Sequence, residues 1–108
     1  MIKEEIKQKL LNFFSSLSDE TRLMILLAIA KGPKSVSEIH KAVGNSKITI
    51  SAISHQLKLL RSMNIVVAKK KGKERLYELS DEYCWCILRD ALRKFGYKID
   101  IRCKKCER

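Results

Sequence analysis

The feature that most constrains this chain is a change of hydrophobic period near residue 64. Before that point, apolar residues recur three or four positions apart, the spacing that places them on one face of a helix. After it come two β-favouring runs, residues 65–67 and 76–79, joined by a lysine-rich stretch that contains Gly72. We therefore expect a mainly α-helical domain that carries a small two-stranded β-hairpin.

The first half of the helical part is expected to form two helices. Residues 2–16 have the pattern of an amphipathic helix. Ser18–Asp19 offers a cap for a second helix, which Gly32–Pro33 would end. This second segment is apolar on most of its faces, so it should be buried at the centre of the domain. A chain of 108 residues is long enough for one such core and too short for two.

A short helix, a turn and another capped helix follow. Ser35 precedes a short apolar-periodic segment that Gly44 would end. Thr49 or Ser51 can cap the next helix, and Asn64 is placed to end it. The apolar stripe of that helix consists of Ile50, Ile53, Leu57 and Leu60. Because its opposite side is polar, the pattern is that of a helix-turn-helix whose second helix leaves one face to solvent.

The hairpin and a last helix complete the expected fold. The lysine-rich stretch around Gly72 predicts a hairpin with a basic tip. We expect the last helix to run from a cap at Ser80–Asp81 to about Lys94, whereas the residues beyond it have no clear period. The predicted fold is a winged helix-turn-helix with about five helices and a two-stranded wing.

The chain is strongly basic. It has 23 Lys and Arg against 12 Asp and Glu, a formal net charge of +11. Such a balance favours a polyanionic partner, usually nucleic acid and less often an anionic membrane. Seven of the basic residues and one acidic residue fall between residues 58 and 75. These positions cover the second helix of the motif and the hairpin, so we expect the partner to be double-stranded DNA.

The expected DNA contacts divide into two groups. In a helix-turn-helix, polar side chains on the exposed face of the second helix reach base edges in the major groove. Basic side chains of the hairpin would contact the phosphates beside it. The candidates are Lys47, Thr49, Ser51, Ser54, His55, Gln56, Lys58 and Arg61 around the helix, and Lys69, Lys70, Lys71, Lys73 and Arg75 in the hairpin. Gln56 has the alternative of packing beside the wing.

A set of short motifs runs through the helix-turn-helix and the hairpin. The most specific is Ser-His-x-Leu-Lys-x-Leu-Arg at residues 54–61. The other motif residues lie before the first of these helices, at the start of the short helix and in the hairpin. They are Leu17, Asp19, Thr21, Arg22 and Ile25, then Val36, Ser37, Glu38 and Ile39, and finally Gly72, Tyr77 and Leu79. With these motifs, about residues 14–95 resemble the ArsR/SmtB family of winged-helix repressors. The resemblance implies a homodimer built on the first and last helices, operator binding, and release of DNA when a metal or other inducer binds.

The resemblance also implies how the chain is divided into a domain and a tail. The chain's departures from the family pattern indicate that two metal sites of the family are absent. Residues 1–95 would form the DNA-binding and dimerisation domain, and residues 96–108 a basic, cysteine-containing tail. One family metal site uses a Cys-x-Cys pair where this chain has Ser35 and Ser37, so that site should be absent. The positions of the other site hold Asp81, Tyr83, Lys94 and Tyr97, and only Asp81 matches a ligand of that site, so the second site should also be absent. His40 is a lone histidine that we expect to be structural or exposed.

The four cysteines form two closely spaced pairs, Cys84-x-Cys86 and Cys103-x-x-Cys106. The spacing resembles that of thiolate zinc sites, and zinc, cadmium, arsenite or copper(I) would suit these thiols. On a regular helix, residues two apart point about 200° away from each other. Either the helix start is distorted, or only one of Cys84 and Cys86 is a ligand. A reversible disulfide would use the same residues, a site could lie within or between subunits, and the first pair could instead be small buried apolar residues.

Three functions fit this sequence. The first is a DNA-binding transcriptional repressor whose DNA affinity is modulated by a thiophilic ion or by thiol oxidation. The second is a winged-helix protein that binds DNA constitutively. The third is a dithiol oxidoreductase that uses Cys103 and Cys106, which the lack of a βαβ pattern disfavours. The sequence has no signal-peptide pattern and no apolar run of membrane length, so we expect a cytoplasmic repressor with no membrane partner and no enzymatic activity.

Overall fold

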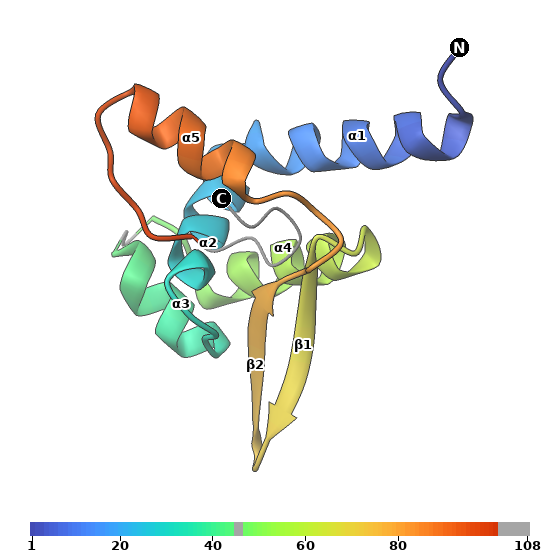
Figure 1. Cartoon of the computed structure of the whole chain (residues 1–108). Coiled ribbons are helices and arrows are strands. Elements are labelled where there is room, and N and C mark those ends of the chain that lie inside the picture. Colours follow the sequence, from blue (N-terminus) through green and yellow to red (C-terminus); the bar gives the residue numbers. More distant parts are fainter. Residues whose placement is uncertain (45–46, 102–108) are drawn as a thin grey trace.

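The computed structural model describes residues 1–44 and 47–101. Within these ranges the elements are α1 (Glu4–Leu17), α2 (Glu20–Ala30), α3 (Val36–Val43), α4 (Ile50–Ser62), β1 (Val66–Lys71), β2 (Glu74–Leu79) and α5 (Cys86–Lys94). The predicted winged helix-turn-helix, with five helices and a two-stranded wing, is confirmed (Figure 1). No helix in the described part of the chain has both the length and the apolar character needed to cross a membrane.

Helix α2 lies at the centre of the molecule, as its apolar sequence predicts. Ile25 and Leu26 have no exposed surface, and α2 contacts α1, α3, α4 and β2. In Figure 1, α1 and α5 lie on one side of this core, and the hairpin projects from the other. The arrangement leaves the hairpin tip well separated from the surface formed by α1 and α5.

The helix starts follow side-chain caps that can be recognised in the sequence. At the start of α2, the Asp19 carboxylate accepts a hydrogen bond of 3.0 Å from the backbone amide of Arg22. At the start of α4, the Thr49 hydroxyl accepts one of 3.0 Å from the amide of Ala52, so Thr49 is the cap that α4 uses. After α4, Asn64 has a φ of 59°, the left-handed conformation predicted for it.

A reciprocal cap fixes the start of α3. The Ser35 hydroxyl accepts a hydrogen bond from the Glu38 amide, and the Glu38 carboxylate accepts one of 3.0 Å from the Ser35 amide. The hydrogen bonds from Ser35 lower the pKa of the Glu38 carboxyl below its ordinary value of 4.5. The charged form of Glu38 therefore stabilises the folded chain.

This cap predicts how stability depends on acid. Because the folded-state pKa of Glu38 is depressed, its contribution is fully present above the ordinary value of 4.5 and is lost as the pH falls through the folded-state pKa. Between about pH 6 and about pH 3, the free energy of unfolding should fall less in Glu38→Gln than in the native protein. Urea denaturation followed by circular dichroism measures both. An equal fall in the two proteins would show that the carboxylate charge has no such role.

Strands β1 and β2 pair in antiparallel register along their full length. Gly72 lies in the turn between them with a φ of 64°, a conformation that favours glycine. Tyr77 of β2 also pairs with Lys34, just before α3, through two backbone hydrogen bonds of 2.8 and 3.1 Å. The sequence does not predict this bridge, which holds the base of the hairpin against the helix-turn-helix.

The last helix begins later than predicted. The cap proposed at Ser80–Asp81 is wrong, because α5 starts at Cys86. The Ser80 carbonyl instead accepts a hydrogen bond of 2.7 Å from the indole nitrogen of Trp85, which is only 4% exposed. Placing this large side chain in the core requires a turn between residues 80 and 85, and the helix begins after that turn.

The chain after α5 returns to the core. Gly96 follows the helix with a φ of 93°, which again favours glycine at a helix end. Ile99 and Ile101 are buried and belong to the hydrophobic core. The segment 96–101, which the sequence analysis assigned to the tail, therefore packs against the domain.

Candidate nucleic-acid interface and thiol pair

Helix α4 has one buried side and one exposed polar side. Ile53, Leu57 and Leu60 are completely buried and fix the helix to the core. Ile50 was predicted on the same stripe but is 49% exposed, because it is the first residue of the helix and extends past the core. The exposed side carries Ser51, Ser54, His55, Lys58 and Arg61. These five candidates therefore share one face of a firmly seated helix.

Gln56 differs from the other candidates on α4. It is half-buried, and its side-chain carbonyl accepts a hydrogen bond of 3.0 Å from Nε of Arg22. The same guanidinium donates to the backbone carbonyl of Ser15 at 3.3 Å. Arg22 thus ties α1, α2 and α4 together, a role that sequence reasoning missed. The Gln56 amide takes part in packing within the domain.

The turn that leads into α4 is held by a histidine. His40 is half-buried, and its Nε2 forms a hydrogen bond of 2.9 Å with the backbone carbonyl of Ile48. His40 is therefore structural, one of the two outcomes expected for it. Lys47 and Thr49 are exposed at the N-terminal end of α4, where the positive end of the helix dipole attracts phosphate.

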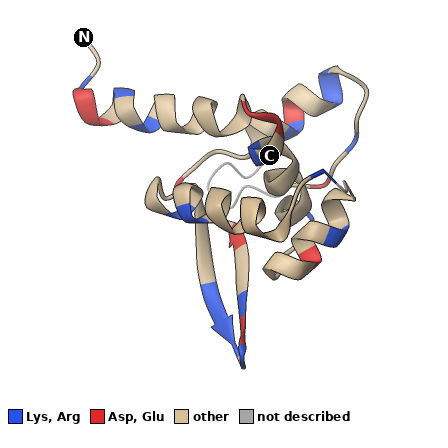
Figure 2. Ribbon diagram, turned by 180° about the vertical axis from the view of Figure 1, so that it is seen from behind, with Lys and Arg blue, Asp and Glu red and all other residues tan. Residues whose placement is uncertain are grey.

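The hairpin carries the densest basic cluster among the described residues. Its exposed basic residues are Lys69, Lys70, Lys71, Lys73 and Arg75. Figure 2 shows the blue of Lys and Arg concentrated toward the hairpin tip. Lys69 forms an ion pair with Glu78, and this hydrogen bond raises the pKa of the Lys69 ammonium above its ordinary 10.5. In the ranges that the structure describes, Lys70, Lys71 and Lys73 form no ion pair, so their charges face solvent.

Helix α1 presents an apolar stripe to solvent. Ile6, Leu10 and Phe14 are spaced four residues apart, and each is about half exposed. Ile87 of α5 is also exposed and lines one shallow cleft with Ile6, Leu10 and Cys84. Large exposed apolar patches on soluble proteins mark interaction sites. We call this surface, which is formed by Ile6, Leu10, Phe14 and Ile87, the α1/α5 face.

Cys84 and Cys86 come together at the start of α5. Cys84 precedes the helix, Trp85 is its N-cap and Cys86 is its first residue. The two sulfur atoms lie 3.0 Å apart. Cys84 lies before the helix and not on it, so the regular-helix geometry that would turn the two thiols apart does not apply to this pair. Both thiols therefore point to the same side.

The described residues provide only part of a metal site. Among residues 1–44 and 47–101, no group of three or more Cys, His, Asp or Glu could hold a metal ion. A tetrahedral zinc ion would also need Cys103 and Cys106, which lie outside the described residues. Two thiolates bound at about 2.3 Å to one zinc ion are about 3.8 Å apart. The sulfurs lie 3.0 Å apart, so they would separate by about 0.8 Å on binding one zinc ion.

An aromatic cluster joins the thiol pair to the helix-turn-helix. Phe13 of α1 stacks on Tyr83 with ring centroids 5.5 Å apart and contacts Trp85 at 5.3 Å. The Tyr83 hydroxyl donates a hydrogen bond of 3.1 Å to the carbonyl of Met63, the C-cap of α4. Burial raises the pKa of the Tyr83 phenol above its ordinary 10.0. Sequence reasoning gave Tyr83 no such role, because its partners are distant in the chain.

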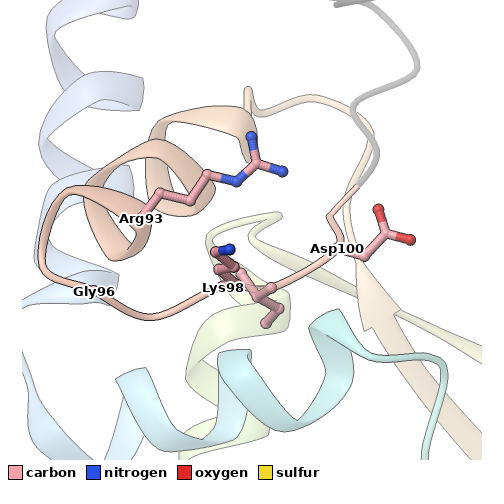
Figure 3. Close-up of a pocket in the computed structure, with 5 residues that line it drawn as sticks. Arg93, Gly96, Lys98 and Asp100 are labelled. Atoms are coloured by element: carbon pink, nitrogen blue, oxygen red, sulfur yellow. The ribbon is translucent and has the colours of Figure 1, made fainter.

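A separate opening lies between the end of α5 and the segment that follows it (Figure 3). It is lined by Arg93, Gly96, Lys98, Ile99 and Asp100 and has a volume of about 600 Å³. The cations of Arg93 and Lys98 are partly offset by the carboxylate of Asp100. The charged residues that line the opening therefore sum to +1.

Comparison with known proteins places this geometry in a family. The model of the arsR family of bacterial regulatory proteins matches residues 19–67, which contain α2, α3 and α4. The arsenical resistance operon repressor of Bacillus subtilis is 30% identical over 81 residues, which cover 74% of this chain and 74% of the repressor. The chain belongs to the arsR family. The resemblance seen in the sequence motifs is thereby confirmed.

One further sequence relative and one solved structure show how much of this chain is similar to known proteins. The transcriptional repressor SmtB homolog of Synechocystis is 34% identical over 84 residues, or 78% of this chain. The match spans 61% of that relative's own length. A homodimeric winged helix-turn-helix DNA-binding domain of Mycobacterium bovis has a TM-score of 0.62 at 25% identity, covering 85% of this chain and 76% of that one. These arsR-family and winged-helix proteins are transcriptional regulators or DNA-binding domains by name.

Proposed function

We propose that this protein is a homodimeric transcriptional repressor that binds a specific sequence in double-stranded DNA, with an affinity that its cysteines modulate. One observation carries the proposal: the exposed polar face of α4 lies next to the hairpin, which has five exposed basic residues. An α-helix fits the major groove of B-DNA, and basic side chains beside it neutralise phosphates. Membership in the arsR family supports the same function.

The residues of this surface would divide DNA recognition between them. Ser54 and His55 lie on the exposed face of α4 and carry hydroxyl and imidazole groups that can hydrogen-bond to base edges. Lys58 and Arg61 continue the same face toward the hairpin and would contact phosphates. Sequence preference would thus come from α4, and most of the binding free energy from phosphate contacts.

This division predicts a change of specificity. In His55→Ala, binding to the preferred DNA should weaken, whereas binding to DNA changed at the base pair that His55 contacts should stay the same. Discrimination at that base pair should therefore fall by about tenfold. Lys58→Ala is the matched control on the same face, and it should weaken binding to all sequences by a similar factor. Fluorescence anisotropy with single-base operator variants measures both. Uniform weakening by His55→Ala would assign this residue to the backbone instead.

A second copy of the chain would cover the α1/α5 face. This face lies on the opposite side of the core from the hairpin tip (Figure 1), so pairing through it leaves both hairpins accessible. Dimeric helix-turn-helix proteins bind half-sites about 34–36 Å apart, one turn of DNA. The homodimeric Mycobacterium bovis domain supports this assembly.

The cysteines lie where a ligand would influence this dimer. Cys84 lines the same cleft as Ile6 and Leu10 of α1, so a change at the thiol would reach the α1/α5 face. A thiophilic ion such as zinc, cadmium, arsenite or copper(I) would need Cys103 and Cys106 as further ligands. Oxidation would need only two neighbouring thiols. We infer a cytoplasmic repressor with regulated rather than constitutive DNA binding, and no catalytic role for the Cys103–Cys106 pair.

A gel-shift experiment on the DNA upstream of the protein's own gene tests this function, since repressors often control their own expression. The reduced, metal-free protein should shift this DNA, and unlabelled DNA of the same sequence should compete far better than random DNA. Addition of thiophilic ions or of an oxidant should weaken the shift. Equal competition by random DNA, or no shift at all, would contradict the proposed function.

A further inference from the structure

We propose that Arg22 is a positioning residue, which fixes the direction of α4 relative to α1 and thereby the spacing of the two DNA half-sites that the dimer accepts. The effect on DNA rests on the proposed function, whereas the contacts that Arg22 makes within the domain do not. Arg22 acts through Gln56 of α4 rather than by touching DNA itself.

The Arg22 guanidinium joins the end of α1 to the middle of α4. Arg22 lies in the first turn of α2, where the Asp19 cap holds its backbone amide. Its Nε donates a hydrogen bond of 3.0 Å to the side-chain carbonyl of Gln56. Its Nη1 donates to Ser15, in the last turn of α1, at 3.3 Å to the carbonyl and 3.4 Å to the hydroxyl. Because a guanidinium is planar and its donors form a rigid fork, the two acceptors are held in a fixed relation to each other.

This bridge provides a directional contact that the packing of α4 does not. In the described part of the chain, α1 packs against α2, whereas α4 packs against α2, α3 and β1. The apolar stripe of α4 holds it to the core, but apolar contacts have no preferred direction. Phe13 of α1 reaches only the end of α4, since it stacks on Tyr83, whose hydroxyl bonds the carbonyl of the C-cap Met63. With that end held, the bond from Arg22 to Gln56 fixes where the rest of the helix points.

The direction of α4 matters because the proposed dimer presents two copies of it to one DNA duplex. Helix α1 contributes Ile6, Leu10 and Phe14 to the α1/α5 face, through which the subunits would pair. A link from α1 to α4 is therefore a link from the dimer interface to the helix that enters the major groove. The two α4 helices must reach half-sites about 34–36 Å apart. A swing of α4 in each subunit changes this distance twice, so the Arg22 bridge sets which spacing the dimer accepts.

The role of Arg22 lies in its geometry rather than in its charge. Arg22 is half-buried, and among residues 1–44 and 47–101 it forms no ion pair. Its acceptors on Ser15 and Gln56 are neutral oxygens. A lysine would keep the positive charge but has a single side-chain nitrogen on a flexible stem, so it cannot hold both acceptors in the same relation. Arg22→Lys therefore removes the bridge and leaves the net charge unchanged.

The test compares DNA duplexes that differ only in half-site spacing. The first is the DNA upstream of the protein's own gene, with its half-sites located by footprinting. The second has one base pair inserted between the half-sites, which moves them apart by about 3.4 Å and rotates one relative to the other by about 35°. A random duplex measures binding without sequence preference. Fluorescence anisotropy with the full-length, reduced protein gives the affinity for each duplex.

Loss of the bridge should relax the spacing requirement. The native protein should bind the inserted duplex about 100-fold more weakly than the first, because only one half-site can be engaged at a time. In Arg22→Lys and in Gln56→Met this ratio should fall to about tenfold, a change within the usual range of coupling between two sites. Binding to the random duplex should stay the same. The double variant Arg22→Lys/Gln56→Met should match each single variant, since all three lack the same bond.

Two further variants are controls for the ratio between the two duplexes. Gln56→Glu keeps a side-chain oxygen that accepts from Arg22, so its ratio should remain that of the native protein. Gln8→Met removes a hydrogen bond of the same length, 3.0 Å, from Gln8 to Asn12 within α1. It should also leave the ratio unchanged. A native-like circular dichroism spectrum shows that each variant folds.

A readout without DNA separates the bridge from the proposed function. In NMR spectra, the Nε–H proton of Arg22 should exchange slowly with water in the native protein and faster in Gln56→Met. The proposal is overturned if Arg22→Lys keeps the native ratio between the two duplexes. It is also overturned if Arg22→Lys weakens binding to all three duplexes equally, the result expected from general destabilisation or from a lost phosphate contact. A native protein that binds upstream and random DNA equally would contradict the proposed function, while the exchange rate would still judge the bridge.

Discussion

Removing three charges from the hairpin tip should weaken binding to every DNA sequence. In the triple variant Lys70→Gln/Lys71→Gln/Lys73→Gln, each lost phosphate contact should lower the slope of log affinity against log salt by about 0.9. Three contacts in each of the two hairpins of the dimer correspond to a change of about 5.4 in slope, and to a loss of about 100-fold or more in affinity at about 0.15 M salt. The effect is large because these lysines are exposed and form no ion pair in the described part of the chain.

The matched control removes three exposed lysines from the other side of the molecule. Lys3→Gln/Lys94→Gln/Lys98→Gln changes the net charge equally, but Lys3 is the N-cap of α1, Lys94 is the last residue of α5 and Lys98 follows α5. Helices α1 and α5 lie on the side of the molecule away from the hairpin tip (Figure 1). The salt slope of this control should stay close to that of the native protein. Anisotropy titrations at several salt concentrations measure both slopes. Equal losses in the two variants would mean that total charge, rather than the hairpin, attracts DNA.

Two negative charges introduced on the α1/α5 face of each subunit should convert the dimer into monomers. In Ile6→Glu/Leu10→Glu, two carboxylates replace half-exposed apolar side chains that the partner would cover. Burying them unpaired is so costly that association should be lost. A monomer binds one half-site only and loses the gain from simultaneous engagement, about 100-fold or more in affinity for the complete operator.

Analytical ultracentrifugation and DNA titration test this prediction together. The control is Gln8→Glu/Asn12→Glu, which adds two carboxylates to the polar side of the same helix and should remain dimeric. Circular dichroism checks that both variants keep their helices. A dimeric Ile6→Glu/Leu10→Glu protein would show that the subunits pair through another surface.

Elements with local signals could be predicted from the sequence. Asp19 and Thr49 cap the helices they precede, and Asn64 adopts the left-handed conformation that ends α4. These signals work because each cap bonds a group within three residues of itself. The buried and exposed sides of α4 followed from its hydrophobic period for the same reason, apart from Ile50 at its first turn.

Features that depend on contacts between distant residues could not be predicted. The start of α5 is set by burial of Trp85, whose surroundings include Phe13, 72 positions earlier in the chain. The bond from Arg22 to Gln56 spans 34 positions. The contact between Cys84 and Cys86 depends on where α5 begins, so the two thiols could be assigned as a pair, but their 3.0 Å separation could not.

The central claim is that α4 and the hairpin read a specific DNA sequence, and one selection experiment tests it most directly. The reduced, full-length protein is mixed with a pool of random DNA duplexes, and bound DNA is recovered and sequenced over several rounds. The account predicts enrichment of an inverted repeat whose half-sites are about one helical turn, or 34–36 Å, apart. The His55→Ala protein should lose the preference at one base pair of each half-site. Recovery of DNA with no enriched sequence would contradict the claim.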